Sequence, residues 1–162
     1  MLTINDLHGQ IPTGRTVDER PVGGAAYLAA YIEMLTGDNP DNTLLVHSGD
    51  MVGASPPESA LLQDEPVITI LNELAFDIGV VGNHEFDEGV DELFRLLDGG
   101  CHPVTEPITG CFAGADFPVL AANVVWSDTG EPILPPMMTF EVDGVEFGFI
   151  GVVTTDTPQD IP

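Results

Sequence analysis

The chain has 162 residues, of which 43% are hydrophobic, enough for one domain with a sizeable core. It carries 27 acidic residues against three arginines and no lysine, so its formal net charge is −24. This charge excludes a nucleic-acid polymer as a partner, because polymer phosphates are bound by clustered lysine and arginine. The acidic surplus favours a high-salt or a secreted, highly soluble setting, and any phosphate chemistry must take its positive charge from bound cations.

Short apolar runs alternate along the chain with stretches of helical spacing, which is typical of an α/β layer structure. We expect strands at residues 2–4, 43–47, 78–81 and 119–121. We expect helices at residues 24–35, 66–75 and 88–97. In the last helix Val90, Leu93, Phe94 and Leu97 share one face, and Asp87 is placed to act as its N-cap.

Beyond residue 122 the pattern becomes β-rich. Residues 140–142 and 145–150 are joined by Asp143-Gly144, which is typical of a tight hairpin turn. A second sheet is therefore expected to begin there.

Two connections rich in proline and glycine, residues 99–118 and 127–136, are expected to be surface loops. Cys101 and Cys111 flank a proline-containing part of the first. A disulfide between them is favoured in an oxidising compartment, and two free thiols are the alternative.

The sequence contains no apolar run of about 20 residues that would span a membrane, and Met1 opens onto a polar motif without a signal-peptide pattern. Either the protein is cytoplasmic or its leader is not part of this chain. We expect the second case, with a secreted, periplasmic or cell-wall-associated protein.

Three polar clusters each follow a predicted buried strand. They are residues 5–9, Gly49-Asp50 and residues 82–85. Because ligands bind beyond the carboxyl ends of the strands in open α/β sheets, neighbouring strands would bring the three clusters to one rim.

The residue types in these clusters suit a metal site. Asp6 and His8, two residues apart, can form a half-site for a transition metal. Asp50 can place one oxygen on each of two cations, and Asn83 offers a neutral oxygen ligand. His84 points elsewhere than Asn83 and is free to face a substrate. Taken singly, each of these residues is better read as a turn or surface residue, and only their conjunction and order make the pattern specific.

The same order, Asp-x-His, then Gly-Asp, then Gly-Asn-His-Glu, resembles that of the calcineurin-like metallophosphoesterases. Longer strings resemble the branch of secreted bifunctional 5'-nucleotidases and 2',3'-cyclic phosphodiesterases. These strings are residues 5–9, 82–87, 123–125 and 148–158. The resemblance implies an α/β (α+β) fold, a layered α-β-β-α sandwich of which only part is present here.

The resemblance also implies roles for individual residues. Asp6 and His8 would bind the first metal ion, Asp50 would bridge, and Asn83 would bind the second ion. The two divalent ions would be Mn, Zn, Co or Mg, and a metal-activated water would attack the phosphate of a small nucleotide. His84, oriented by Asp87, would stabilise the transition state or assist the leaving group.

Four other polar residues near these motifs are given structural roles. His47 is expected to be a packed histidine rather than a ligand, and His102 a surface residue. Glu85 is expected to be solvated, and Glu88 to lie in the first turn of a helix, where the dipole favours negative charge.

Four donors are too few for two ions. The family completes its site with later histidines, one isolated and two in a Gly-His-x-His string, so we expect residues 1–162 to be the N-terminal portion of a single metallophosphoesterase domain. The remaining catalytic part and a C-terminal substrate domain would lie elsewhere. Alone, this portion should bind metal weakly and self-associate, since Val145, Phe147 and Phe149 would be poorly covered.

Three functional interpretations remain open. The first is hydrolysis of 5'-nucleotides, with cyclic nucleotides or nucleotide sugars as related substrates. The second keeps the fold but acts on bound sulfur species, as some relatives in the family do. The third is a non-catalytic module for metal binding or surface interaction that retains half a site.

Overall fold

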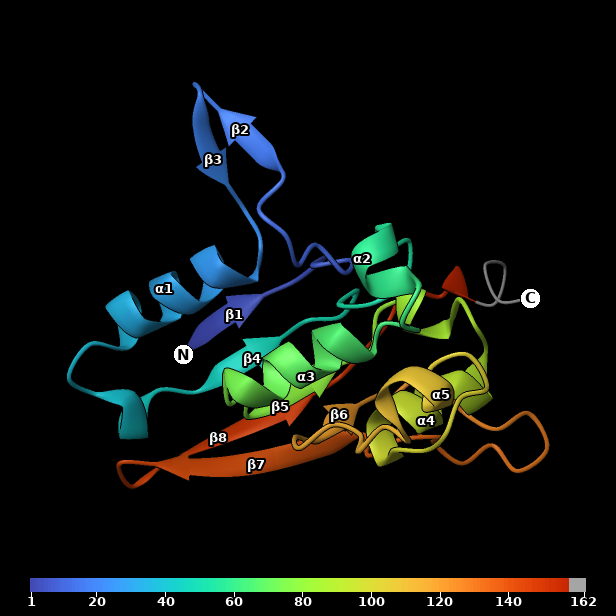
Figure 1. Cartoon of the computed structure of the whole chain (residues 1–162). Coiled ribbons are helices and arrows are strands. Elements are labelled where there is room, and N and C mark those ends of the chain that lie inside the picture. Colours follow the sequence, from blue (N-terminus) through green and yellow to red (C-terminus); the bar gives the residue numbers. More distant parts are fainter. Residues whose placement is uncertain (158–162) are drawn as a thin grey trace.

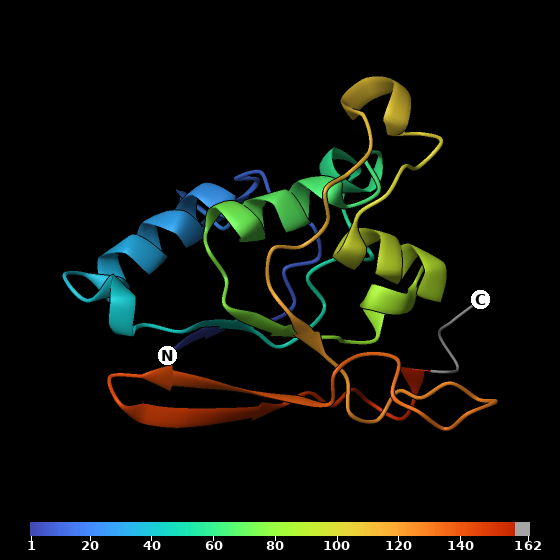
Figure 2. The same cartoon turned by 90° about the horizontal axis from the view of Figure 1, so that it is seen from below.

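The computed structural model describes residues 1–157, and its elements form three layers: helices, a parallel sheet and an antiparallel hairpin (Figures 1 and 2). The parallel sheet has the order β1-β4-β5-β6. The four strands therefore follow one another across the sheet in the same order as along the chain. Its strands are β1 (Leu2–Ile4), β4 (Leu45–His47), β5 (Ile78–Val80) and β6 (Val119–Leu120). All four expected strands are confirmed, and their carboxyl ends share one edge.

Helices cover one face of this sheet (Figure 2). The longer ones are α1 (Ala25–Thr36), α3 (Glu65–Glu73) and α4 (Val90–Asp98). Shorter elements are α2 (Pro57–Ala60), α5 (Glu106–Thr109), and the 3-10 turns η1 (Pro40–Asn42) and η2 (His84–Phe86). The main core lies between these elements and the sheet, and Val67, Leu71 and Phe86 are fully buried in it. None of the helices described is both long enough and apolar enough to cross a membrane.

A hairpin covers the other face of the sheet. It consists of β7 (Met137–Val142) and β8 (Val145–Ile150), and Asp143 and Gly144 in its turn have φ values of 51° and 74°, as a tight hairpin turn requires. Its inner face packs on Leu44, Val46, Ile78 and Leu120. The predicted layered α/β fold is therefore confirmed for the part of the sandwich that this chain supplies.

The inner face of the hairpin is only partly covered. Val145 and Phe147 are 55% and 38% exposed, as expected. The expectation for Phe149 is wrong, because its ring is half-buried, lies edge-on to Phe140 at 5.8 Å and packs against the sheet.

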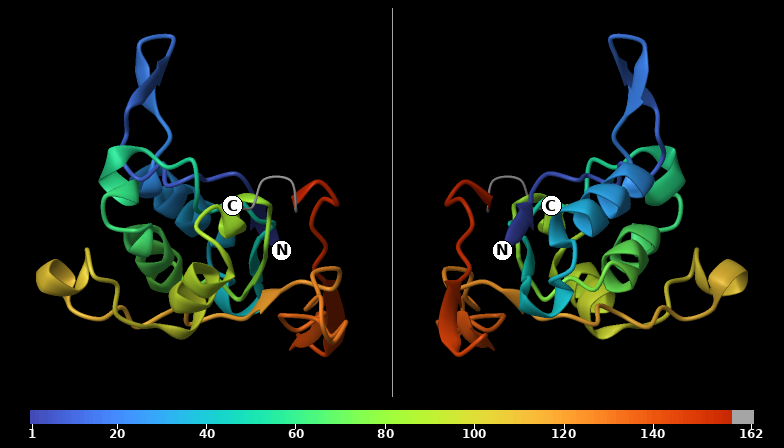
Figure 3. Two further views of the ribbon diagram at one scale, coloured as in Figure 1. Left: turned by 90° about the vertical axis from the view of Figure 1, so that its right-hand side faces the viewer. Right: turned by 90° about the vertical axis from the view of Figure 1, so that its left-hand side faces the viewer.

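A second hairpin was missed from the sequence. Strands β2 (Arg15–Val17) and β3 (Arg20–Val22) pair antiparallel and project from the body beside α1 (Figures 1 and 3). Each has only three residues, too short for a pattern of alternation. Their turn residues Asp18 and Glu19 have φ values of 49° and 62°, which residues other than glycine seldom adopt.

The start of α4 also differs from the prediction. Gly89, not Asp87, occupies the N-cap position, and the helix begins at Val90, so Glu88 precedes it instead of lying in its first turn. The carboxylate of Asp87 is engaged elsewhere, as described below. Pro158, at the end of the last string that carried the family resemblance, lies outside the described residues.

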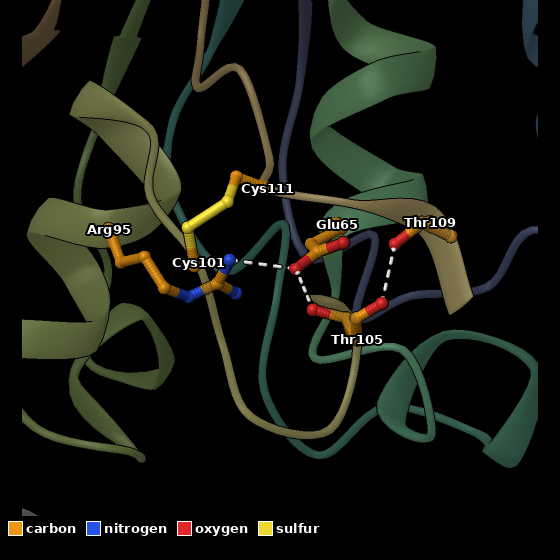
Figure 4. Close-up of a disulfide and its surroundings, with 6 residues drawn as sticks. All are labelled: Glu65, Arg95, Cys101, Thr105, Thr109 and Cys111. Atoms are coloured by element: carbon orange, nitrogen blue, oxygen red, sulfur yellow. Dashed lines mark hydrogen bonds and ion pairs between the residues drawn. A yellow bond between two sulfur atoms is a disulfide. The ribbon is translucent and has the colours of Figure 1, made fainter. Parts of the chain in front are cut away.

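The loop at residues 99–118 is more ordered than a plain surface loop. Cys101 and Cys111 are joined by a disulfide, one of the two alternatives that the sequence left open, and α5 lies within the closed loop. Thr105, fully buried, donates a hydrogen bond of 2.6 Å to Glu65 Oε1, which also accepts one of 2.7 Å from Arg95 (Figure 4). A charged network thus anchors the disulfide loop to α3 and α4.

Candidate metal centre

The loops that follow β1 and β4 run side by side at the carboxyl edge of the sheet. The backbone N–H of Asp6 donates to the carbonyl of Gly49 at 3.1 Å, and that of His8 donates to the carbonyl of Asp50 at 3.0 Å. These two bonds extend the pairing of β1 with β4 beyond the strands. They bring the first two polar clusters together, as expected.

The third cluster joins them because two glycines allow close approach. A Cβ atom added to Gly49 would overlap the backbone nitrogen of Gly82, and one added to Gly82 would overlap Oδ1 of Asp50. Gly49 also has a φ of 92°, which favours glycine. The loop after β5 can therefore reach the carboxylate of Asp50.

Three of the predicted ligands have left-handed backbone conformations. The φ values of Asp6, His8 and Asp50 are 53°, 45° and 56°. Such conformations cost about 1–3 kcal/mol each for a residue other than glycine, and they cluster at functional sites. The surrounding hydrogen bonds hold this strained geometry in place.

Asp6, His8 and Asp50 converge on one point. Each offers a ligand atom, and these atoms all lie within 4.8 Å of one another. His8 Nδ1 lies 2.9 Å from the carbonyl oxygen of Gly53, so it is the protonated nitrogen that donates there, and Nε2, 3.7 Å from Asp6 Oδ1, keeps a free lone pair. Among the described residues no arginine is ion-paired with Asp6 or Asp50. Two carboxylates and one imidazole nitrogen are a donor set that fits a divalent transition metal.

His84 lies against this cluster, and Asn83 directly precedes it in the chain. The backbone N–H of His84 donates to Asp50 Oδ1 at 3.0 Å, and Asn83 is the N-cap residue of the turn η2. The rings of His84 and His8 meet edge to face with centroids 4.8 Å apart. His84 therefore stands at the edge of the cluster, where the sequence predicted it.

Asp87 orients His84. Its Oδ2 lies 2.9 Å from His84 Nδ1. This hydrogen bond, more than the nearby charges of Asp87, Asp50 and Glu85, raises the pKa of His84 above its ordinary value although partial burial opposes the shift. The pair leaves Nε2 of His84 as the nitrogen that is not engaged by Asp87.

Glu85 is the polar residue that the sequence reading placed wrongly. It is buried, with 9% exposure, and its carboxylate accepts backbone N–H bonds from Asp50 (2.9 Å), Met51 (2.8 Å) and Gly82 (2.5 Å). Burial raises its pKa, while these three hydrogen bonds oppose the shift. The carboxylate ties the loop after β4 to the loop after β5. One sequence signal could have predicted this burial. Glu85 lies in a turn close to two glycine-containing loops, and the backbone N–H groups of such loops need an acceptor because they lie beyond the strands.

His47 is a packed histidine, as expected. It is 3% exposed, its ring takes the place of a side chain at Gly79, and it lies edge-on to Phe117 with centroids 5.4 Å apart. Neither of its nitrogens has a hydrogen-bond partner within the described structure, and burial lowers its pKa to about 4. His102 is half-buried in the disulfide loop, where its Nδ1 accepts the N–H of Val104 at 3.2 Å.

The layered α/β fold carries, at the carboxyl edge of its parallel sheet, a carboxylate–imidazole cluster of a kind that can hold a metal ion. Residues 1–147 match the model of the family described as Calcineurin-like phosphoesterase. The chain belongs to that family.

Two relatives share close to half of their aligned residues with the chain. It is 45% identical over 161 residues to Endonuclease YhcR of Bacillus subtilis, covering 95% of this chain and 13% of that protein. It is 43% identical over 173 residues to Cell wall protein Lmo0130 of Listeria monocytogenes, covering 98% of this chain and 22% of that protein. The chain thus spans less than a quarter of either relative.

A solved structure shows the same fold. The structure of a 5'-nucleotidase precursor from Thermus thermophilus superposes with a TM-score of 0.68 and 26% identity. The likeness covers 96% of this chain and 28% of that one.

Proposed function

We propose that the chain is the N-terminal part of a metal-dependent hydrolase that acts on phosphoesters of nucleotides through two divalent ions. The observation that carries the proposal is the convergence of ligand atoms of Asp6, His8 and Asp50 within 4.8 Å of one another, with no arginine among the described side chains paired to either carboxylate. The pair His84–Asp87 at the edge of the cluster adds a group that can meet developing negative charge.

Asp6 and His8 would hold one ion, Asp50 would lie between both, and Asn83 would contribute to the second. When bound, the ions would supply the positive charge that polarises the phosphoryl group and activates the attacking water. The chain's own residues would do the rest: Gly53 keeps the lone pair of His8 Nε2 free through its bond to Nδ1, and Asp87 favours the protonated form of His84. A protonated His84 can donate a hydrogen bond to a phosphoryl or leaving-group oxygen.

The likeness to a 5'-nucleotidase precursor supports a small nucleotide as the substrate class. One relative is called an endonuclease, but the net charge of −24 on this chain opposes binding of a polynucleotide. We infer that a mono- or dinucleotide is preferred to a polymer, and an oligonucleotide belongs in the substrate panel as the competing possibility.

We further propose that the donors still needed for two ions come from a part of the domain outside residues 1–162. The small share of each relative that the chain covers supports this. The disulfide Cys101–Cys111 and the relative named as a cell wall protein support a setting outside the cytoplasm.

The test is a phosphatase assay of the protein at its natural full length with Mn, Zn, Co and Mg against nucleotides, glycerol phosphate and an oligonucleotide. Asp50→Asn should lose bound metal and activity together. His84→Asn should lower kcat by about 10² or more with its metal content intact, because its role is in the transition state.

Asp38→Asn is the matched control, since Asp38 is an exposed aspartate that belongs to none of the three clusters. It removes the same charge and should change neither metal content nor kcat. Full metal binding by Asp50→Asn, or the absence of phosphoester hydrolysis with every ion, would contradict the proposed function.

A further inference from the structure

Gly53 is the residue that both histidines of the candidate metal centre contact. Its carbonyl oxygen accepts a hydrogen bond of 2.9 Å from His8 Nδ1, the bond that leaves Nε2 of His8 free for an ion. A Cβ atom added to Gly53 would lie 2.5 Å from the carbonyl oxygen of His84 and 2.6 Å from Asp87 Oδ2. A small displacement of Gly53 would therefore disturb its bond to His8 or its packing against His84 and Asp87.

The backbone N–H of Gly53 is held by a carboxylate outside the three polar clusters. It donates to Asp64 Oδ2 at 3.1 Å. The second carboxylate oxygen, Oδ1, accepts a hydrogen bond of 2.5 Å from the hydroxyl of Ser59, which is fully buried. Because Ser59 fixes one oxygen, the other stays directed at Gly53. Hydrogen bonds thus link Ser59 to Asp64, Asp64 to Gly53, and Gly53 to His8.

Asp64 does not serve the helix that it precedes. It occupies the N-cap position of α3, where an aspartate usually accepts an N–H of the first turn, yet its side chain makes no capping hydrogen bond. Its φ of 56° and ψ of 8° are left-handed, a conformation that costs about 1–3 kcal/mol for a residue other than glycine. The contact with Gly53, eleven residues earlier, is what uses the carboxylate.

The loop that carries His8 packs on the same segment. A Cβ atom added to Gly9 would lie 2.5 Å from Ser55 Oγ and 2.8 Å from Cβ of Ser59, and Figure 1 shows α2 beside the loop that follows β1. The imidazole of His8 and the anchor of Asp64 are therefore held in one closely packed frame.

We propose that Asp64 is a positioning residue of the metal centre, which holds Gly53 so that His8 keeps its proton on Nδ1 and presents Nε2 to the ion. The inference rests on the proposed function, because it takes His8 as a metal ligand. Asp64 is not one of the three residues whose ligand atoms converge. Without its carboxylate the N–H of Gly53 loses its acceptor, the carbonyl can turn away, and His8 can adopt the tautomer in which Nε2 carries the proton and cannot bind an ion.

The first measurement reads the tautomer of His8 without any metal. The metal-free full-length protein, labelled with ¹⁵N-histidine, is studied by NMR at about pH 8, and the signal of His8 is the one that His8→Gln removes. The wild type should show the Nδ1–H tautomer alone. Asp64→Gly removes the carboxylate but tolerates the left-handed conformation, and it should show both tautomers.

The second measurement is calorimetric titration of the full-length protein with Mn²⁺. Asp64→Gly should lower the affinity about 10–100-fold, as for other groups that orient a ligand. Asp64→Asn should recover most of it, since its amide oxygen can accept from Gly53 while its NH₂ group donates to the hydroxyl oxygen of Ser59. Ser59→Ala should have a smaller effect than Asp64→Gly, because Oδ2 of Asp64 remains.

Asp77→Gly is the matched control. Asp77 Oδ2 accepts the backbone N–H of Leu45 at 2.7 Å, at the start of β4 and so at the opposite end of that strand from Asp50. The substitution removes the same kind of hydrogen bond. It should leave the tautomer of His8 and the Mn²⁺ affinity unchanged, and urea unfolding verifies that each variant is folded under the conditions of titration.

The outcomes separate the two proposals. If the wild type binds Mn²⁺ but Asp64→Gly keeps the wild-type tautomer or the wild-type affinity, or if Asp77→Gly loses as much affinity, Asp64 has no positioning role and the proposed function stands. If the wild type binds no Mn²⁺ and hydrolyses no phosphoester, the proposed function fails, and the tautomer comparison still decides whether Asp64 holds His8.

Discussion

Two buried glutamates, Glu65 in α3 and Glu85 in η2, have very different hydrogen-bond partners. Glu65 is 5% exposed, and its Oε1 accepts hydrogen bonds from Arg95 and Thr105 (Figure 4). Glu85 is 9% exposed, and three backbone N–H groups hold it without a basic side chain. The first network brings its own cation, and the second does not.

The difference separates a network whose charges are balanced by side chains of the chain itself from one whose charges are not. Around Glu65 each charge has a partner within the chain, so nothing further is needed from solvent. Around Glu85 the loops present two more carboxylates, Asp6 and Asp50, and neither of the arginine side chains that the structure describes pairs with them. A cluster of like charges that the fold leaves unbalanced calls for a cation from outside, which is the physical basis of the metal proposal.

The largest expected effect comes from breaking the balanced network. Arg95→Met should lower the free energy of unfolding by about 3–5 kcal/mol, because it leaves Glu65 buried without its cation. Urea unfolding followed by circular dichroism measures this. Arg20→Met is the matched control, because Arg20 is exposed and is in no ion pair with the residues that the structure describes, and it should change stability little. Equal losses of unfolding free energy in the two variants would show that the ion pair between Arg95 and Glu65 does not stabilise the fold.

His47 extends the comparison to a buried titratable side chain whose ring nitrogens have no hydrogen-bond partner among the described residues. Its pKa is lowered to about 4 in the folded state, from an ordinary value near 6.5. Between these two pKa values the unfolded state binds more protons than the folded state. The contribution of His47 to the free energy of unfolding is therefore fully present above about pH 6.5 and is lost as pH falls towards 4. The loss amounts to about 3 kcal/mol.

His47→Leu should remove this part of the pH dependence, measured as the difference in urea unfolding between pH 7 and pH 4.5. His102→Gln changes a histidine that is only half-buried and should keep the wild-type slope. An unchanged slope in His47→Leu would mean that His47 is already protonated in the folded protein at the lower pH.

The disulfide closes the loop that the balanced network anchors. Replacing Cys101 and Cys111 together by serine should lower the free energy of unfolding by about 2–3 kcal/mol, from the entropy of a loop with a separation of ten residues. Adding a reductant to the wild type should give the same shift in midpoint and should give none in the double variant. Stability that does not respond to either change would show that the network alone holds the loop.

The smallest expected change is in the unbalanced network. Glu85→Gln keeps the shape of the side chain but places an amide group where a backbone N–H needs an acceptor, so the loops after β4 and β5 should separate slightly. Metal affinity should fall about 10–100-fold, as for other residues that position ligands, and calorimetric titration with Mn²⁺ on the full-length protein measures it. Glu88→Gln, which removes an exposed carboxylate three residues away, should leave the affinity unchanged.

Much of the site could be predicted because its signals are local. Asp6, His8 and Asp50 each follow directly on a buried strand, and neighbouring parallel strands bring their carboxyl ends to one edge. The position of His84 beside the cluster followed from the same reasoning. Glu85 could not be placed in this way, because a glutamate in a turn is usually solvated, and only the N–H groups of Asp50, Met51 and Gly82 make its burial favourable.

The sequence by itself determined the layered fold class, the four strands of the parallel sheet, the hairpin β7–β8 and the order of the polar clusters, since these depend on patterns a few residues long. Tertiary structure alone decided which carboxylates are buried and how they are balanced. Glu65 is hydrogen-bonded to Arg95 and Thr105, which lie 30 and 40 residues away along the chain. Gly49 and Gly82 must lack a side chain only because two loops distant in sequence touch there. A buried charge is stable only where distant groups complete its hydrogen bonds, and that completion is a property of the folded chain rather than of any segment.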